Sequence, residues 1–444
     1  MQRIEIDNFM ALKKATIELR SLLLLLGEQA SGKSTISKLI YYFKSVPQDL
    51  LYVIGFEKSL PLAPSFHKQL TNRFFDFFGT ITDLPKFEIR YFYTEQHYIQ
   101  LSHTPHIEKS FNIFISEQNE LLEQCAQLKA KISNHWLTPY EQAERVRAVK
   151  DLEQFVMGWF ANEREPVFVP AGRSPTINYP EGFQMDLSGL LRNGFLQLET
   201  QPNLGTFPID LRLIYQFLNH TEIIKQRFIG HTFQNLVKDQ VARGNPVNRS
   251  LLDKVEKKIE KILKGNYQHD QQGEKIFYAE QEYVLLTRAS SGQQEAIRIV
   301  QDIFLILLDQ QKAFRVIEEP EAHLYPMAQK HLIELIVLLL NQSNSQVIIT
   351  THSPYILSIL NNLLYAGRLA NQQPAHSQEI NTIIESDYWL ETNKSAVYFL
   401  RDGQSQSIMD QETGLIGQNF LDEISEELGA EFDQLYRLGA KSRR

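Results

Sequence analysis

One short segment, Gly27–Thr35, limits the fold more than any other part of this sequence. It reads G-E-Q-A-S-G-K-S-T and fits the pattern G-x-x-x-x-G-K-[ST]. Five leucines at 22–26 predict a buried strand before it, and apolar residues from Ile36 to Phe43 recur at helical spacing after it. A phosphate site needs this context, because glycines let backbone N–H groups close around phosphate and a helix N-terminus adds partial positive charge. The alternative is a chance glycine-rich turn, at roughly one or two per cent for a chain of this length.

The phosphate-site interpretation assigns a role to the whole loop. We expect Lys33 to contact the β- and γ-phosphates of ATP and the Ser34 hydroxyl to bind Mg²⁺. The predicted nucleotide-binding residues are Gly27, Glu28, Gln29, Ala30, Ser31, Gly32, Lys33, Ser34 and Thr35.

A second chemical signal is the segment 314–320, F-R-V-I-E-E-P, in which a buried strand ends in two acids. One such acid could simply cap a helix. In a chain with a phosphate loop, we expect Glu318 to hold a Mg²⁺-bound water. We expect Glu319 to orient or deprotonate the attacking water, because γ-phosphate transfer needs charge neutralisation and a placed nucleophile.

The segment 289–294, A-S-S-G-Q-Q, precedes an apolar helix and resembles the signature motif of ABC ATPases. Such a Ser/Gly turn presents a hydroxyl and backbone N–H groups to a γ-phosphate. In that family the signature and the phosphate loop meet across a dimer, so the resemblance implies that Ser290 of one copy completes the site of the other. The predicted contact residues are Ser290, Ser291, Gly292 and Gln293. The alternative is a simple helix N-cap at Ser291.

The segment 347–354, V-I-I-T-T-H-S-P, is a predicted strand that ends in a histidine. A single histidine at a strand end is often structural. The order of phosphate loop, signature, paired acids and histidine is similar to the ABC order. The resemblance therefore implies that His352 contacts the γ-phosphate and that Glu321–Leu324 occupies the D-loop position.

Together these motifs resemble the SMC/RecF/OLD branch of ABC ATPases. The resembling residues are I-x-I-x-N-F at the start, S-S-G-Q-Q, E-E-P-E-A-H-L-Y-P and T-T-H-S-P, and they cover roughly 1–45 and 285–360. One departure is Glu318, which stands where the branch usually has aspartate. Another is the glutamine loop, for which Ala171–Arg173 is the best position, so Arg173 is a weaker candidate site residue.

The order of apolar patterns predicts an α/β ATPase head with a mixed sheet and covering helices, a helical lobe that carries the signature, and an inserted helical hairpin. One hairpin helix has its apolar stripe at Leu121, Cys125, Leu128 and Ile132, the other at Val146, Val149, Val156 and Trp159, with a turn near 133–137 between them. Cys125 is then a packing residue. The hairpin is far longer than a usual connection, so we expect a protruding, coiled-coil-like arm.

The predicted division of the chain has five parts. They are the first part of the ATPase lobe at 1–113, the hairpin at 114–162, the lobe junction and helical lobe at 163–287, the signature, Mg²⁺-binding strand and switch histidine at 288–393, and a C-terminal extension with acidic helices at 394–444.

Composition narrows the compartment and the partners. A net charge of −8 and a pI near 5.9 give no overall reason for non-specific nucleic-acid binding. A single cysteine excludes an intramolecular disulfide and a cysteine-based metal cluster. The leucine run 22–26 is far shorter than the roughly 20 residues of a bilayer span. We therefore expect a cytoplasmic protein without a membrane partner.

The resemblance implies an ATP-hydrolysing dimer that serves as sensor or scaffold subunit of a bacterial anti-phage complex, such as PARIS or Septu, and controls a separate effector nuclease or toxin. We expect no nuclease in the chain itself, because the sequence after His352 has neither the D-x-D pair of a Toprim nuclease nor an HNH-type histidine cluster. The alternative is a RecF- or SMC-like DNA-repair or DNA-maintenance ATPase that clamps DNA. Nucleic acid and a phage-encoded trigger are further candidate partners.

Overall fold

The computed structural model of the 444-residue chain describes residues 1–56, 61–79, 84–105, 111–132, 139–162, 164–173, 209–410, 412–417 and 429–435. Its first part is a β-rich lobe that contains the leucine strand and the helix after the phosphate loop. The elements are β1 (Arg3–Phe9), β2 (Leu12–Glu18), β3 (Leu22–Gly27), α1 (Lys33–Phe56), α2 (Ala63–Phe78), β4 (Phe87–Phe92), β5 (Tyr98–His103) and β6 (Phe111–Ile115).

The middle of the chain is mainly helical. It contains α3 (Gln118–Ala130), α4 (Pro139–Trp159), β7 (Glu165–Val169), α7 (Ile209–Phe228), α8 (Phe233–Ala242), α9 (Arg249–Leu263), β8 (Asn266–Asp270), β9 (Gly273–Phe277), β10 (Tyr283–Leu285) and the 3-10 helix η1 (Leu286–Arg288).

From residue 291 strands and helices alternate. The elements are α10 (Ser291–Leu308), β11 (Ala313–Glu318), α11 (Pro326–Ser343), β12 (Gln346–Thr351), α12 (Pro354–Gln372), α13 (Ser377–Ile383), β13 (Ser395–Arg401) and β14 (Gln404–Ser407), with short 3-10 helices η2 (Pro374–His376), η3 (Ser386–Tyr388) and η4 (Thr392–Lys394). Of the region where acidic helices were predicted, 429–435 is helical, and 418–428 and 436–444 lie outside the described residues.

One sheet of 11 strands joins both ends of the described chain, in the order β6-β5-β4-β1-β2-β14-β13-β3-β12-β11-β7. Strands β13, β3, β12, β11 and β7 pair in parallel, whereas β2, β1, β4, β5 and β6 pair antiparallel. This confirms the predicted mixed α/β fold. Since parallel strands share a direction, the loops after β3, β7, β11 and β12 open at the same edge of the sheet.

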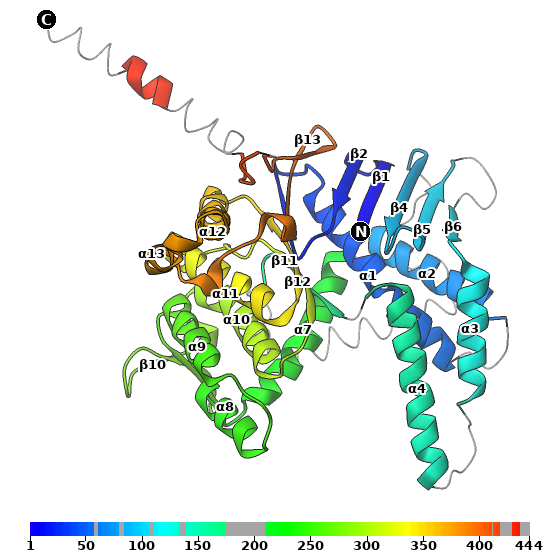
Figure 1. The fold of residues 1–444 in the computed structure, drawn as a ribbon, viewed down its shortest axis with the longest axis horizontal. Helices are drawn as coiled ribbons and strands as arrows, with labels where there is room; N and C mark the ends of the chain where they lie inside the picture. The colour runs from blue at the N-terminus through cyan, green and yellow to red at the C-terminus, as the bar shows by residue number, and fades with distance from the viewer. Residues whose placement is uncertain are drawn as a thin grey trace, which may run out of the picture.

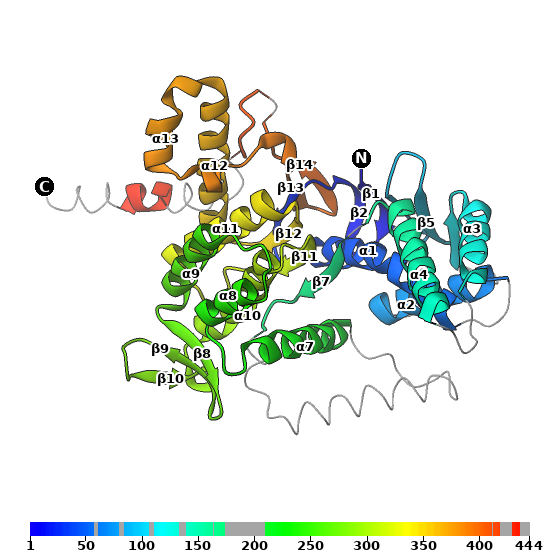
Figure 2. The ribbon, with the colours of Figure 1, turned by 60° about the horizontal axis from the view of Figure 1, so that its bottom comes forward.

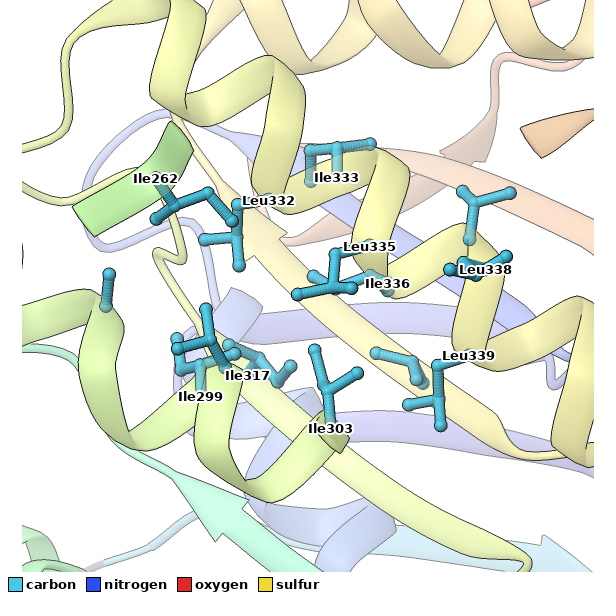
Figure 3. Packing of buried hydrophobic residues seen from close by; sticks show 14 of the residues in the cluster. Ile262, Ile299, Ile303, Ile317, Leu332, Ile333, Leu335, Ile336, Leu338 and Leu339 are labelled. Atoms are coloured by element: carbon cyan, nitrogen blue, oxygen red, sulfur yellow. The ribbon is translucent and has the colours of Figure 1, made fainter. Parts of the chain in front are cut away.

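Helices cover both faces of the parallel strands, which explains why β3 is continuously apolar (Figure 1). Leu22, Leu24 and Leu26 pack in one core with α10, α11 and α12. Leu23 and Leu25 point to the other face, where they pack with α1 and α2. Figure 3 shows the first core, with Ile299 and Ile303 of α10 facing the α11 leucines beside Ile317 of β11.

The predicted hairpin is present as α3 and α4, which lie side by side and extend away from the sheet (Figures 1 and 2). Cys125 is buried, as its predicted packing role requires. The stripe predicted on α4 is partly wrong, because Val146 is 69% exposed and Val149 36%. The buried stripe runs through Ala148, Leu152 and Val156, which are four residues apart and so share one helix face.

Two remaining predictions meet the limits of the described chain. The turn expected at 133–137 lies outside the described residues. Among the described residues, no helix combines the length and apolar character that crossing a membrane requires.

Candidate nucleotide-binding site

The loop between β3 and α1 needs glycine at both of its ends. Gly27 has a φ of 147° and Gly32 a φ of 101°, which other residues rarely adopt. Space is also lacking, because a Cβ on Gly27 would lie 2.3 Å from the Leu400 carbonyl oxygen and one on Gly32 would lie 2.5 Å from Cδ2 of Leu12. Within the loop, the buried Ser31 Oγ has no hydrogen-bond partner among the described residues, so a hydroxyl is left for a ligand oxygen.

Lys33 is the first residue of α1, and its side chain folds back over the loop. Its Nζ donates hydrogen bonds to the carbonyl oxygens of Gly27 at 2.8 Å and Glu28 at 2.7 Å. Burial lowers the pKa of the Lys33 amine, and nearby carboxylates, Glu319 first among them, partly oppose this shift. The amine therefore lies at the centre of the loop, where a bound phosphate would meet it.

A cavity of about 380 Å³ lies between the loop and the carboxyl ends of β11 and β12. Its lining residues are Ala11, Gln29, Ala30, Ser31, Gly32, Lys33, Ser34, Thr35, Ala171, Glu318, Glu319, Thr350 and His352. The loop, both acids and the histidine thus meet in one place. In the described chain the lining does not include Ser290–Gln293.

Glu318 ends β11 and is 7% exposed. One carboxylate oxygen accepts a long hydrogen bond from Ser37 Oγ and the other from the Ala171 backbone N–H, both at 3.4 Å. Ser37 lies one helical turn after Ser34 on α1, so both hydroxyls lie on the same face of the helix. This spacing in the sequence could have predicted a second hydroxyl beside Glu318. Carboxylate and hydroxyl oxygens suit Mg²⁺, which in phosphate sites takes few ligands from the protein itself. Glu318 and Ser34 therefore fit the predicted ion.

Glu319 occupies an uncommon backbone conformation at the edge of the cavity. Its φ is 44°, in the left-handed region that costs a non-glycine residue energy and often marks functional sites. Its backbone N–H donates to the Thr350 carbonyl oxygen on β12 at 2.9 Å. One Glu319 carboxylate oxygen lies 3.8 Å from Nε2 of His352, and both side chains are partly open to solvent. A carboxylate and an imidazole ring thus border the same open side of the cavity.

The predicted signature turn, Ser290–Gln293, begins α10 with a capping box. Ser290 is the N-cap, because its Oγ accepts from the Gln293 N–H at 3.4 Å while Gln293 Oε1 accepts from the Ser290 N–H at 3.0 Å. The alternative cap at Ser291 is therefore wrong by one residue. Gly292 packs against Glu321–Leu324, the segment predicted as the D-loop, since a Cβ there would lie 2.6 Å from the His323 carbonyl oxygen.

Glu321 in the D-loop makes contacts that the sequence did not predict. Its Oε1 accepts hydrogen bonds from the Thr351 hydroxyl at 2.5 Å and from the His352 N–H at 3.0 Å. A second link runs from Ser353 Oγ to Gln329 Oε1 at 2.8 Å. The D-loop and the start of α11 therefore hold the backbone that presents His352.

Arg173, the weaker candidate, is not among the cavity's lining residues in the described chain. It is 1% exposed, and its guanidinium donates to the carbonyl oxygens of Glu318 at 2.8 Å and Glu319 at 3.1 Å. Burial lowers the pKa of this guanidinium, and carboxylates, with Glu295 the strongest, oppose the shift. Arg173 therefore contacts the backbone of the two acids and not the space where a ligand would lie.

Comparison with known proteins adds a family match. The model of the AAA ATPase domain family matches residues 1–154 and 215–357, which is more than half of the chain and includes every cavity-lining residue except Ala171. No curated protein sequence matches the chain.

Solved structures similar to the chain include an SMC head bound to the C-winged helix domain of ScpA, with 12% identity, coverage of 91% of this chain and 96% of that chain, and a TM-score of 0.40. The SMC head domain from Thermotoga maritima has 10% identity, coverage of 91% and 97%, and a TM-score of 0.35. The recombination mediator RecF has 13% identity, coverage of 91% and 97%, and a TM-score of 0.34. The family assignment rests on the sequence match.

Proposed function

Because the chain belongs to the AAA ATPase domain family, we propose that it binds ATP with Mg²⁺ at Gly27–Thr35 and hydrolyses it to ADP and phosphate. The observation that carries the proposal is that residues far apart in the sequence line one cavity. They supply a cation for the phosphates, oxygen ligands for the metal ion and a carboxylate base, which are the groups that phosphoryl transfer to water needs.

Each group has a defined part in this reaction. Lys33 exchanges its backbone carbonyl partners for β- and γ-phosphate oxygens, which make stronger charge-assisted hydrogen bonds. Ser34 would bind Mg²⁺ and Glu318 would hold a Mg²⁺-bound water, and the ion would supply charge neutralisation for the phosphates. Glu319 orients the attacking water and accepts its proton, and His352 donates a hydrogen bond to the γ-phosphate.

The proposed functional unit is a dimer in which Ser290 of one copy completes the cavity of the other. Ser290 and Ser291 are exposed at the N-terminus of α10, which suits an anion, and they do not line their own cavity in the described chain. Large apolar side chains are exposed next to the site in sequence, with Tyr325 78%, Met327 50% and Tyr355 53% exposed. A closed dimer would cover such a surface.

For the cellular role, we propose a sensor or scaffold subunit of a bacterial anti-phage complex that controls a separate effector nuclease or toxin. The support is the resemblance of the motifs to stand-alone ATPase subunits of such systems. A pull-down of the native protein separates this role from DNA maintenance. A co-purified nuclease or toxin supports the defence role, and nucleic acid recovered without an effector overturns it.

Nucleotide titration and steady-state hydrolysis test the activity itself. Lys33→Ala should lose ATP binding, because the phosphate-facing cation is gone. Lys38→Ala is the matched control, since Lys38 lies on the same helix and pairs with Asp210 at 2.5 Å instead of lining the cavity. Glu319→Gln should bind ATP without turnover, because an amide cannot accept the proton of water. Unchanged affinity in Lys33→Ala, or normal turnover in Glu319→Gln, would contradict the assignment.

Mixing two inactive variants tests the dimer. Ser290→Arg should bind ATP in its own loop but block the partner's site, whereas Lys33→Ala should not bind ATP. A mixed dimer places both lesions in one site and leaves the other site with native Lys33 and Ser290, so activity should return. No recovery, together with concentration-independent hydrolysis by a monomeric wild type, would show that Ser290 acts only as a helix cap.

A further inference from the structure

Arg173 connects three elements at the site edge of the sheet. It follows β7, the strand next to β11, and its side chain is fully buried. Its guanidinium donates to the carbonyl oxygens of Pro170 at 3.1 Å, Glu318 at 2.8 Å and Glu319 at 3.1 Å. It therefore contacts the ends of both strands from behind the cavity.

The Glu319 contact matters because the backbone there is strained. A φ of 44° persists in a glutamate only where surrounding contacts over-determine it. Three hydrogen bonds do so here: the Glu319 N–H donates to Thr350, and the Glu319 carbonyl oxygen accepts from the Ala322 N–H at 3.0 Å and from Arg173 at 3.1 Å. The Ala322 bond lies within the same turn, whereas the Thr350 and Arg173 bonds tie the turn to other parts of the fold. Without the Arg173 bond, the turn that presents Glu319 can shift.

The other side of Arg173 is bonded to α10. Its Nε donates to the Glu295 carbonyl oxygen at 2.9 Å, its backbone N–H donates to Glu295 Oε2 at 3.1 Å, and Nε lies 3.3 Å from that same oxygen. Glu295 stands in the second turn of the helix that Ser290 caps. One guanidinium thus joins the helix of the signature turn to the peptides of both acids.

We propose that Arg173 is a positioning residue that holds the peptides of Glu318 and Glu319 in a fixed place relative to the signature turn Ser290–Gln293. This proposal rests on the proposed hydrolysis. It means that one side chain aligns the half of the site formed by Glu318 and Glu319 with the half that Ser290–Gln293 offers to the partner copy. Position 173 lies outside the residues that the family model matches, so this role comes from the contacts alone.

Arg173→Lys is the direct test, because it keeps the charge but loses the planar set of donors that reaches three carbonyl groups and Glu295 at once. The chain offers a matched control. Arg315 also joins β11 to α10, through Asp302, with Nε–Oδ2 at 2.6 Å and a second hydrogen bond at 3.1 Å. It stands three residues before Glu318, about 10 Å away along the strand at roughly 3.3 Å per residue.

We expect Arg173→Lys and Arg315→Lys to lower the melting temperature comparably. Only Arg173→Lys should lower kcat, by about 10- to 100-fold per folded molecule, since a displacement of about 1 Å at a reacting group costs up to 10²-fold. Its Kd for ATP should change less than about threefold, because Arg173 itself does not line the cavity and would not touch the nucleotide. If Arg173→Lys fails to fold, Glu295→Gln replaces it, with Asp302→Asn as its control and the same split between kcat and Kd expected.

The outcomes separate the two proposals. Suppose that the wild type is active and that the 173 and 315 substitutions lower kcat equally, or that the 295 and 302 substitutions do. Either result overturns the positioning role and leaves the ATPase assignment intact. A wild type that binds ATP but does not hydrolyse it overturns the proposed function, and the positioning role with it.

Discussion

Replacing Ser290 with aspartate separates the two functions that this residue could have. Ser290 caps α10, and we propose that it also contacts the γ-phosphate bound to a partner copy. Aspartate is as good an N-cap as serine and its negative charge is favourable at a helix N-terminus. It cannot, however, approach a phosphate. Ser290→Asp should therefore keep the fold and lose the reaction.

The expected changes in stability and in dimer closure can be worked out from the cap geometry and from the charge of aspartate. The Ser290 Oγ to Gln293 N–H distance is 3.4 Å, so this is a long bond, and Ser290→Ala should cost only about 0.5–1 kcal/mol. In Ser290→Asp, the attraction between the aspartate charge and the helix dipole should stabilise the fold by about 0.3–1 kcal/mol. Against a phosphate about 4 Å away, a unit charge at an effective dielectric constant of about 20 is repelled by about 4 kcal/mol. That repulsion reduces the equilibrium constant for closing the dimer about a thousandfold.

Three measurements decide the outcome. Thermal melting should show Ser290→Asp within about 2 °C of wild type, nucleotide titration should show unchanged affinity, and steady-state hydrolysis should be nearly absent. Thr232→Asp is the control, because Thr232 caps α8 by accepting from Asn235 at 3.2 Å and is not among the cavity-lining residues. Wild-type turnover by Ser290→Asp would refute the contact in trans and leave Ser290 as a cap.

Two other groups give predictions about stability and reactivity. Burial raises the pKa of Glu274, but the attraction to Arg298 and the hydrogen bonds from Arg298 and Tyr267 outweigh burial and bring this pKa to about 2. The interactions of the Glu274 carboxylate with Arg298 and Tyr267 should therefore add about 3 kcal/mol to the free energy of unfolding above pH 4.5. This contribution is lost as the pH falls toward 2. Urea unfolding of wild type and Glu274→Gln should show a stability difference that shrinks over this range, and a pH-independent difference would contradict it. Burial also raises the pKa of the Cys125 thiol to about 12, so iodoacetamide at pH 8 should label it only after denaturation, and rapid labelling of the native protein would show that the α3 packing opens.

The parts of the fold that were predictable have strong local patterns. The strand β3 and the alternation of strands and helices after residue 291 follow from long apolar runs at strand or helix spacing. Strand β14, with the sequence Q-S-Q-S, has no apolar residue and forms because β13 pairs along it and β2 bonds beside it. The α4 stripe was misplaced because valine at 146 and 149 was assumed to be buried, whereas the smaller Ala148 is buried instead. Contacts with the rest of the fold determine both the β14 strand and the buried face of α4, and such contacts override local sequence preference.

The candidate site divides in the same way. The convergence of Gly27–Thr35, Glu318, Glu319 and His352 on one cavity was predictable because each lies at or directly after the end of a buried strand, and parallel strands bring such positions to one edge. The contacts that support them join residues with no common local pattern, such as Arg173 with Glu295 and Glu321 with His352. An arginine after a strand end can point into the cavity or behind the strands, and its neighbours in sequence do not distinguish these directions. What distinguishes them is where carbonyl oxygens converge, and only the folded sheet reveals that those of Pro170, Glu318 and Glu319 lie together beside the Arg173 guanidinium.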